Sequence, residues 1–408
     1  MHRIAGHKLM RACLLGMTQI VGFGSTLYLL TVLAAPIGNT MGWPLSWVTA
    51  GMSAGILVSA LAAPHIGRRI ARGDGRRILV TGSLLLAAGL AVIGSAWHYA
   101  IYLLGWCIVG LGMACSLYDA VFGTLGRAYG HDARRLISTV ALWGGFASTV
   151  FWTLSGLLTD ALGWRMTCLV YAAAQIAISL PVFRFATPTG SPHTEPTAAG
   201  TRARSGPAPV HTLEPARTLA GLLFVAEVLV ASIVAVHLVN LLGEMGIGLA
   251  AAVALGAFIG PAQVAGRAVE MTLGQRLHPA MTALIAVGAI LAGLCLLSLG
   301  KPAANTIAVI VYGAGIGVLS IARGTLPLAL FGPARQPVVM GQIARPVMLV
   351  QALSPVAGAL LVTHLPPAAV FWLLAAITGI ALIAGLALRH ICLSAGDAAA
   401  ATQGRPRS

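Results

Sequence analysis

The sequence predicts an all-α membrane protein with twelve transmembrane helices arranged as two pseudo-symmetric six-helix bundles. Three observations predict this fold: an apolar composition, a series of apolar runs of spanning length, and a polar gap that divides the runs into six and six. Of the 408 residues, 58% are hydrophobic and 9% are charged, whereas a soluble domain carries about 25% charged residues. A water-soluble fold is therefore excluded.

The apolar runs set the positions of the spans, because about 20 apolar residues cross the hydrocarbon core as a helix. In the first half we expect spans at 12–36, 46–70, 78–97, 99–126, 136–159 and 166–184. In the second half we expect spans at 218–241, 250–271, 280–299, 304–330, 340–363 and 368–389. The first run is too long for the apolar region of a signal peptide, so we interpret it as an uncleaved span.

A polar stretch over residues 187–216 separates the two sets of spans. Its Pro, Gly, Thr and charged residues bury too little apolar surface to fold, which is typical of a linker. We therefore expect an N-terminal bundle over 1–186, a cytoplasmic linker over 187–216, a C-terminal bundle over 217–390 and a cytoplasmic tail over 391–408.

The basic residues indicate how the chain lies in the membrane. Most of them fall in loops predicted on one side, whereas the loops of the other side carry only Arg165 and Lys301. Because Lys and Arg concentrate in cytoplasmic loops, we expect a multi-pass protein of the plasma (inner) membrane with both termini in the cytoplasm. The same rule explains the formal net charge of +15 without a nucleic-acid partner.

A short motif recurs once in each half. The loop after the second span reads GRRIARGDGRR from Gly67 to Arg77, and the loop after the eighth span reads GRAVEMTLGQR from Gly266 to Arg276. Two glycines and two arginines hold the same places in both strings, 199 residues apart. That spacing is the size of one half, which indicates duplication of a six-helix unit.

With these two loops and the Gly163-Trp164-Arg165 turn before the sixth span, the chain resembles the major facilitator superfamily of secondary transporters. The resemblance implies that the first, fourth, seventh and tenth spans line a central cavity that opens alternately to each side. It also implies that residues of the repeated loops latch the cytoplasmic ends of the helices. The gating residues implied in this way are Gly67, Arg68, Asp74, Arg76, Gly266, Arg267, Glu270 and Arg276.

The sequence departs from the family pattern in two places. The usual acidic residue four places after the first Gly is Ala71 here, with Asp74 displaced along the loop, whereas the second half keeps an acid at Glu270. In the fifth span Gly144 and Gly145 stand without the Pro of the antiporter signature, which disfavours drug efflux.

Three charged residues interrupt the apolar spans: Asp119 in the fourth, Glu227 in the seventh and Arg323 in the tenth. A charge in the bilayer core costs several kcal/mol, so each is expected to face protein or a water-filled path. Asp119 and Arg323 are 204 residues apart, close to the duplication period, so we expect them at similar depth in opposite halves. They could meet when the cytoplasmic side closes.

We expect Arg323 to bind an anionic group of the substrate, because guanidinium offers forked donors that match a carboxylate or phosphate. Asp119 and Glu227 complete the predicted substrate site, and either could carry a coupling proton. Because histidine is the side chain whose charge ordinarily changes near neutral pH, His237 is a further candidate for proton coupling. The alternatives are a permanent structural ion pair between Asp119 and Arg323 and a structural role for His237.

No enzyme motif accompanies these residues. The sequence contains no HExxH string, no GxxxxGK[ST] loop and no Cys or His spacing typical of a metal site. We therefore expect neither catalysis nor a cofactor or metal, and a monomer whose partners are a small-molecule substrate, protons and the lipid bilayer. The leading hypothesis is proton-coupled transport of a small organic or inorganic anion by alternating access. The alternative is a proton-antiport exporter of a toxic or lipophilic compound, and a receptor on the same scaffold is a third possibility.

Overall fold

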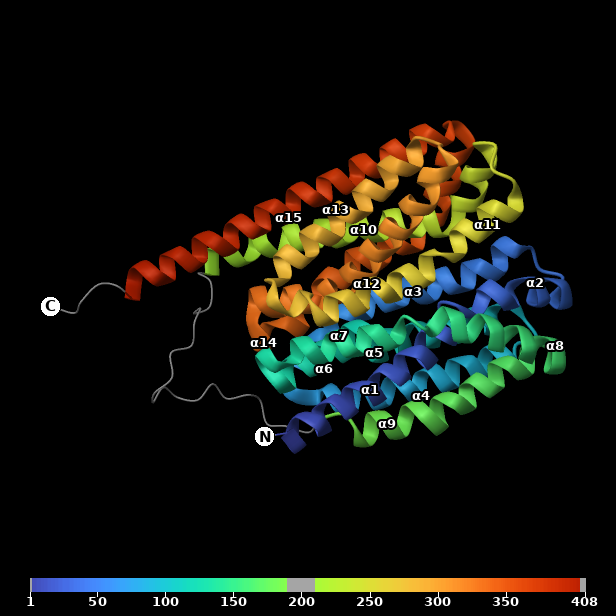
Figure 1. The fold of residues 1–408 in the computed structure, drawn as a ribbon. Helices are drawn as coiled ribbons and strands as arrows, with labels where there is room; N and C mark the ends of the chain where they lie inside the picture. Colours follow the sequence, from blue (N-terminus) through green and yellow to red (C-terminus); the bar gives the residue numbers. More distant parts are fainter. Residues whose placement is uncertain (1, 189–209, 404–408) are drawn as a thin grey trace.

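The computed structural model describes residues 2–188 and 210–403, and these ranges contain helices and short connections but no β-strand. Figure 1 shows two lobes side by side, the first half in blue to green and the second in yellow to red. The helix α1 begins and the helix α15 ends on the same side of the molecule, which we call the terminal side. The opposite side, near the labels α2 and α11, is called the far side.

The first half consists of nine α-helical segments. They are α1 His2–Gly24, α2 Leu29–Met41, α3 Leu45–Arg69, α4 Gly75–Gly94, α5 Tyr99–Ser116, α6 Tyr118–Tyr129, α7 Ala133–Gly144, α8 Ala147–Ala174 and α9 Leu180–Phe185. Wider π-type turns cover Ile70–Asp74 and Gln175–Ser179, and a 3-10 turn covers Gly130–Asp132.

The second half has fewer and longer segments. They are α10 Val210–Glu244, α11 Leu249–Ala257, α12 Ile259–Thr272, α13 Pro279–Ser298, α14 Pro302–His364 and α15 Pro367–Gln403, with a 3-10 turn at Gly274–Arg276. The very long α14 is two antiparallel arms, because Gly332 adopts φ 70° and ψ 169°, which is not helical. The break at Gly163 (φ 77°) divides α8 in the same way.

These segments form the twelve predicted spans. Five spans are single helices or arms: α3, α4, α10, α13 and α15. Two more are the arms of α14, and the two parts of α8 belong to the fifth and sixth spans with α7 and α9. The remaining three are the pairs α1 with α2, α5 with α6, and α11 with α12. The predicted turn at Gly163 is confirmed, whereas the predicted loop 331–339 shrinks to the single break at Gly332.

The ends of the predicted domains fall differently in the structure. Helix α10 begins at Val210, inside the predicted linker, and α15 continues to Gln403, inside the predicted tail. The rest of the linker, 189–209, and the last five residues of the tail, 404–408, lie outside the described residues.

Several spans are interrupted in the middle, which continuous apolar runs do not predict. In the first span Ser25 and Thr26 turn their hydroxyls back onto the carbonyls of Val21 (2.7 Å) and Gly22 (2.6 Å), which competes with the helical ladder. In the fourth span Leu117 is extended (φ −82°, ψ −173°), so α6 starts anew at Tyr118. Both interruptions lie beside the cavity described below.

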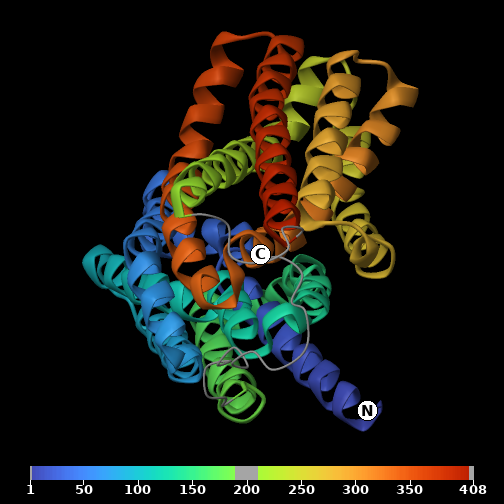
Figure 2. The same cartoon turned by 90° about the vertical axis from the view of Figure 1, so that its left-hand side faces the viewer.

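The buried apolar residues form separate cores in the two halves. One cluster contains residues of the second half alone, whereas two clusters in the first half also take in Ile321, Leu328, Met340 and Ala352 from α14. Figure 2, seen from the terminal side, shows α14 segments against the helices of the first half. Large apolar side chains such as Leu157 (65% exposed) cover the outer surface, as expected of a protein that faces lipid.

One close contact between the halves is made by backbone on backbone. Gly67, near the end of α3, lies on the carbonyl of Pro337, and Gly341 lies on the carbonyl of Ala63, both at the terminal side. A methyl group at either glycine would overlap those oxygen atoms. We call this contact the glycine seam.

Replacing Gly67 with Ala is expected to destabilise the closed terminal side by about 1–3 kcal/mol, the usual cost of overpacking. The matched control is Gly221→Ala on α10, where an added methyl group meets no atom within 4 Å. The control should be neutral or stabilising because Ala favours helix. Thermal unfolding, together with the distance between spin labels at the exposed Arg69 and Arg335, measures both effects. Equal behaviour of the two variants would contradict a tight seam.

Candidate functional site

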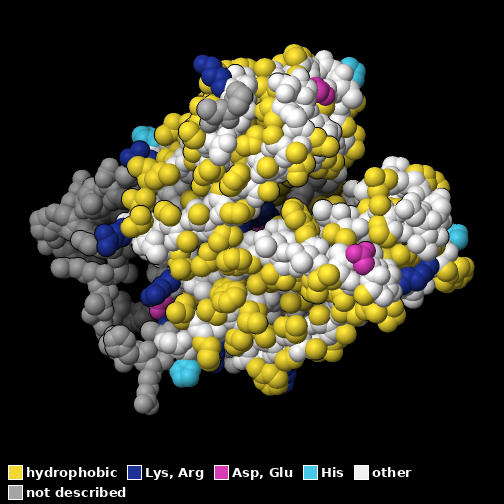
Figure 3. Space-filling view, turned by 45° about the vertical axis from the view of Figure 1, so that its right-hand side comes forward, with side chains coloured by type: hydrophobic (Ala, Val, Ile, Leu, Met, Phe, Trp, Pro, Cys, Tyr) yellow, Lys and Arg dark blue, Asp and Glu magenta, His cyan; other side chains and the backbone are white. Residues whose placement is uncertain are grey.

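A cavity lies between the two halves and is closed at the terminal side. Its volume of about 220 Å³ suits a small solute rather than a drug-sized one. The surface in Figure 3, turned to bring the far side forward, is hollowed between the two lobes, with dark-blue basic atoms at the floor of the hollow. The lining comes from α1, α3, α5, α6, α10, α12 and both arms of α14. Because the terminal side is closed and the surface is hollowed at the far side, a solute reaches the cavity from the far side.

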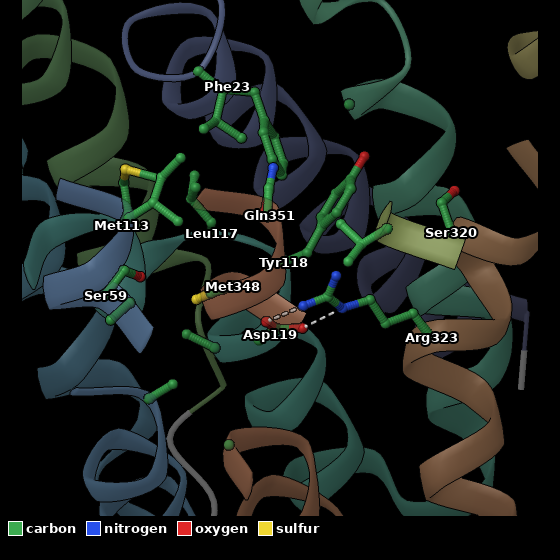
Figure 4. Close-up of a pocket in the computed structure, with 18 of the residues that line it drawn as sticks. Phe23, Ser59, Met113, Leu117, Tyr118, Asp119, Ser320, Arg323, Met348 and Gln351 are labelled. Carbon is green, nitrogen blue, oxygen red and sulfur yellow. Dashed lines mark hydrogen bonds and ion pairs between the residues drawn. The ribbon is translucent and has the colours of Figure 1, made fainter. Parts of the chain in front are cut away.

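At its floor Asp119 and Arg323 form a two-pronged ion pair that joins the halves. The Arg323 Nε donates to Asp119 Oδ1 at 3.0 Å, and its Nη2 donates to Oδ2 at 2.8 Å (Figure 4). Asp119 stands in the first turn of α6, directly after the break at Leu117, where a helix N-terminus favours a carboxylate. The side chains keep 17% (Asp119) and 23% (Arg323) of their surface exposed, so a solute in the cavity can touch them.

Glu227 lines the same cavity from α10. Its carboxylate makes no hydrogen bond or ion pair with any residue in the described ranges, and it interacts electrostatically with Arg323. The structure thus brings together the three charged residues that the sequence predicted for the substrate site. The carboxylates of Asp119 and Glu227 thus both face the guanidinium of Arg323, which is already paired with Asp119.

Arg267 reaches the cavity from α12 but is almost fully buried among protein groups. Its Nε donates to the hydroxyl of Ser320 at 3.0 Å, and its Nη1 donates to the carbonyl of Ala141 in the first half at 3.2 Å. Only 6% of the residue is exposed. It therefore ties α12 to α7 and α14 and presents little surface to a solute.

Glu270 closes the terminal side through polar contacts with α7. Its two oxygens accept from Arg134 Nη2 at 3.4 Å and from Ser138 Oγ at 3.0 Å. Arg134 also donates to the carbonyls of Gly274 and Leu277, both at 2.6 Å. We call Glu270, Arg134 and Ser138 the acid clamp. Sequence reasoning missed Arg134 and Ser138, since an arginine at the end of a loop looks like any positive-inside residue.

The other predicted gating residues divide into two groups. Gly67 lies in the glycine seam between the halves, while Gly266 packs on Ala314 within the second half. Within residues 2–188 and 210–403, no hydrogen bond or ion pair joins any of the remaining four to the other half. They are Arg68 and Arg276, which are exposed; Asp74, which lies 3.8 Å from Arg77 in the same turn; and Arg76, whose Nε is buried without a hydrogen-bond partner.

At the position of the missing acid the first half is held by its backbone. The carbonyl of Ala71 accepts from Arg127 Nε at 3.1 Å. An ionic contact at this loop is thus replaced by a hydrogen bond within the first half. The two halves close the terminal side by different means: the glycine seam on one edge and the acid clamp on the other.

His237 lies away from the cavity, between α10 and the second arm of α14. Its Nε2 is 3.3 Å from the carbonyl oxygen of Pro355, and its ring fills the space above Gly358. The residue is 8% exposed and does not belong to the cavity lining. Among the described residues, no group of three or more His, Cys, Asp or Glu side chains is placed to hold a metal ion.

Two helical bundles that enclose a charged cavity, open on one side and shut on the other, define a membrane transporter. The comparisons with known proteins agree with this class. The sequence matches the family described as Major Facilitator Superfamily over residues 12–345, and the chain belongs to that family. It is a transporter and not an enzyme. No curated protein matches the sequence.

Solved structures of low sequence identity share the fold. The transporter FucP in the outward conformation is 14% identical, with a TM-score of 0.72 over 93% of this chain and 98% of that chain. The proton:xylose symporter XylE is 9% identical, with a TM-score of 0.69 over 92% and 94% of the two chains. The human organic anion transporter MFSD10 is 16% identical, with a TM-score of 0.67 over 94% and 99%.

Proposed function

We propose that this protein is a proton-coupled secondary transporter that moves a small anion by alternating access. The single observation that carries the proposal is the two-pronged pair of Asp119 and Arg323, which joins the halves at the floor of a cavity that a solute can enter. A guanidinium held in this way is already arranged to receive a carboxylate or a similar planar anion.

In the proposed mechanism Asp119 occupies Arg323 until a proton arrives. Protonation removes the negative charge of Asp119 and one of its strong acceptor oxygens, so the forked pair weakens and the donors of Arg323 become available to the substrate. The incoming anion replaces the charge that Asp119 loses. Proton and anion binding therefore favour each other, and the charge of the site is the same before and after loading.

Glu227 supplies a second carboxylate beside Arg323 in this proposal. Its oxygens have no hydrogen-bonding partner among the described residues and interact with Arg323 through charge alone. A proton released from Asp119 can be taken up there, directly or through cavity water. His237 has no place in this path, because its ring contacts Pro355 outside the cavity.

We further propose that the terminal side is cytoplasmic in the plasma (inner) membrane. The loops between α3 and α4 and between α12 and α13 carry arginines and lie on that side, in agreement with the positive-inside rule. The far side, and with it the mouth of the cavity, then faces outward. The 6+6 arrangement is proposed to work as a monomer.

Reconstitution into proteoliposomes tests the function. Uptake of radiolabelled pentanoate, gluconate, succinate and inorganic phosphate, and of cationic dyes, is measured with and without an inside-alkaline pH gradient, and uptake by protein-free liposomes is subtracted. We expect at least one anion to accumulate with the gradient and a protonophore to abolish the accumulation. Dye movement against the gradient, with no anion transported, would instead support the exporter and overturn the proposal.

The acid clamp gives a prediction about the conformational cycle. Glu270→Gln keeps the shape of the side chain but leaves the largely buried guanidinium of Arg134 without its counter-charge. We expect the terminal side to open at least about tenfold more often, since breaking a buried pair is strongly unfavourable. Distances between spin labels at the exposed Arg135 and Arg276 report the opening.

The matched control for this variant is Asp74→Asn in the equivalent loop of the first half. Asp74 and Arg77 are 3.8 Å apart, with 36% and 89% of their side chains exposed, so their contribution is within about 1 kcal/mol. The control should leave the label distances nearly unchanged. If both substitutions open the terminal side equally, the acid clamp has no special role in closure.

A further inference from the structure

The charges that line the cavity limit the substrate to one negative charge. Two arginines reach the lining, but Arg267 is only 6% exposed and directs its Nε and Nη1 at Ser320 and Ala141, whereas the Arg323 side chain is 23% exposed and is the cation that an anion can reach. Two carboxylates, Asp119 and Glu227, face the same space. A dianion such as a phosphate ester or a dicarboxylate would meet a single available cation and an additional repulsion.

The walls above this charged floor are mainly apolar. On the first arm of α14, Ile316 stands two turns from Arg323 on the same face, about 10 Å along the helix, with Leu319 between them. The opposite wall contributes Met113 and Leu117, and Met348 comes from the second arm of α14 (Figure 4). A carboxylate on Arg323 therefore places its body among hydrocarbon side chains.

An aromatic cluster runs alongside Arg323 and adds to this apolar wall. The rings of Phe23 and Tyr118 lie 4.6 Å apart, and Tyr118 stacks on Phe122 at 4.8 Å. The hydroxyl of Tyr118 donates to the carbonyl of Ala141 at 3.1 Å and is thereby not available to a solute. The ring beside Arg323 consequently offers carbon rather than a donor.

Few hydrogen-bonding groups remain for a polyhydroxylated substrate. The Ser59 hydroxyl lines the cavity, is fully buried and has no hydrogen-bond partner, and Gln351 and Tyr28 are the other neutral side chains with free polar atoms. Even with some hydroxyl groups on Glu227 and Arg323, a sugar presents more of them along the apolar walls than these neutral side chains can satisfy, and each unpaired one weakens binding. An acid with at most one or two polar substituents meets no such difficulty.

Accordingly, we infer that the substrate is a monocarboxylate with a largely apolar body, held by Arg323 at its carboxylate and by the apolar walls along its chain. The inference rests on the proposed function and gives the substrate class of that same site. Sugars, phosphate esters and dicarboxylates are excluded from this class.

Binding to the purified full-length protein in nanodiscs tests the inference without interference from membrane leakage of weak acids. Acetate, propionate, butyrate and pentanoate are titrated at pH 5.5, with succinate, glucose 6-phosphate and xylose as competitors. We expect affinity to rise about fourfold for each added methylene, the increment of burying one CH₂ group. Each competitor should bind at least tenfold more weakly than pentanoate.

A pair of variants separates the walls from the charged floor. Ile316→Thr, which puts a hydroxyl on the wall and is isosteric with the control Ile316→Val, should weaken pentanoate severalfold and leave acetate unchanged, whereas Ile316→Val should have little effect on either. If affinity does not change with the chain length of the acid, or if succinate or glucose 6-phosphate binds more tightly than pentanoate, the inference is overturned while the proposal of anion transport still stands. If Arg323→Gln binds every acid as well as the wild type does, the proposed function falls with it.

Discussion

Arg323→Gln is expected to lower anion affinity at least about thirtyfold. Glutamine is uncharged and cannot reproduce the two parallel donors that Arg323 directs at Oδ1 and Oδ2 of Asp119. Removing one partner of a desolvated, hydrogen-bonded charge pair typically costs about 2–5 kcal/mol, which is the origin of the estimate. Titration of the anion that the wild-type protein transports, at one fixed pH, gives the affinity change directly.

Two further variants show whether the loss arises from binding or from folding. Arg323→Lys retains the charge but not the fork, so it should recover part of the affinity. Arg323→Gln combined with Asp119→Asn removes both charges of the pair and should restore thermal stability without restoring anion binding. Wild-type affinity in the single variant would show that the pair is only structural, which is the alternative that the sequence left open.

Asp119→Asn is expected to abolish proton-driven accumulation while anion exchange continues. The amide has nearly the shape of the carboxyl group but cannot take up a proton, and it leaves Arg323 without its internal anion. In the wild-type protein anion affinity should rise as the pH falls, because protonation of Asp119 frees Arg323. In the variant Arg323 is free at every pH, so the affinity should be high and independent of pH.

The size of the expected anion gradient follows from the coupling of one proton to one anion. A gradient of one pH unit supports about a tenfold anion gradient in the wild-type protein, because a factor of ten corresponds to 1.36 kcal/mol. The variant should only equilibrate the anion, while counterflow of labelled against unlabelled anion persists. The matched control is Asp74→Asn, at a carboxylate that does not line the cavity, which should keep accumulation. The reverse result, with Glu227→Gln uncoupled and Asp119→Asn intact, would make Glu227 the proton carrier.

The sequence predicted the spans well because length and hydropathy dominate the structure of a chain in a bilayer. It did not predict the break at Leu117, which no proline marks, or the break at Phe258, three residues before Pro261 in the first turn of α12. At Gly332 it predicted a loop where a single left-handed residue suffices to reverse the chain. Local conformation at these points depends on neighbouring helices, about which an apolar run carries no information.

The sequence predicted those residues of the site whose charge is unfavourable inside a bilayer. Asp119, Glu227 and Arg323 stand out because each would be unfavourable in lipid, and the structure places all three on one cavity. The partners of Glu270 could not be found in this way, because Arg134 and Ser138 lie at a helix end where polar residues are ordinary. The position of His237 between two helices likewise depends on packing, not on its own chemistry.

The glycine seam has a consequence for how the protein would begin to change shape. Backbone atoms of Gly67 and Gly341 meet Pro337 and Ala63 with no side chain inserted between them. Separating these surfaces requires no side-chain rearrangement and exposes little apolar surface, so water can enter the glycine seam early in the opening. Opening at the acid clamp must instead rehydrate the charged groups of Glu270 and Arg134. Opening of the terminal side would then be asymmetric, with the glycine seam separating first and the acid clamp last.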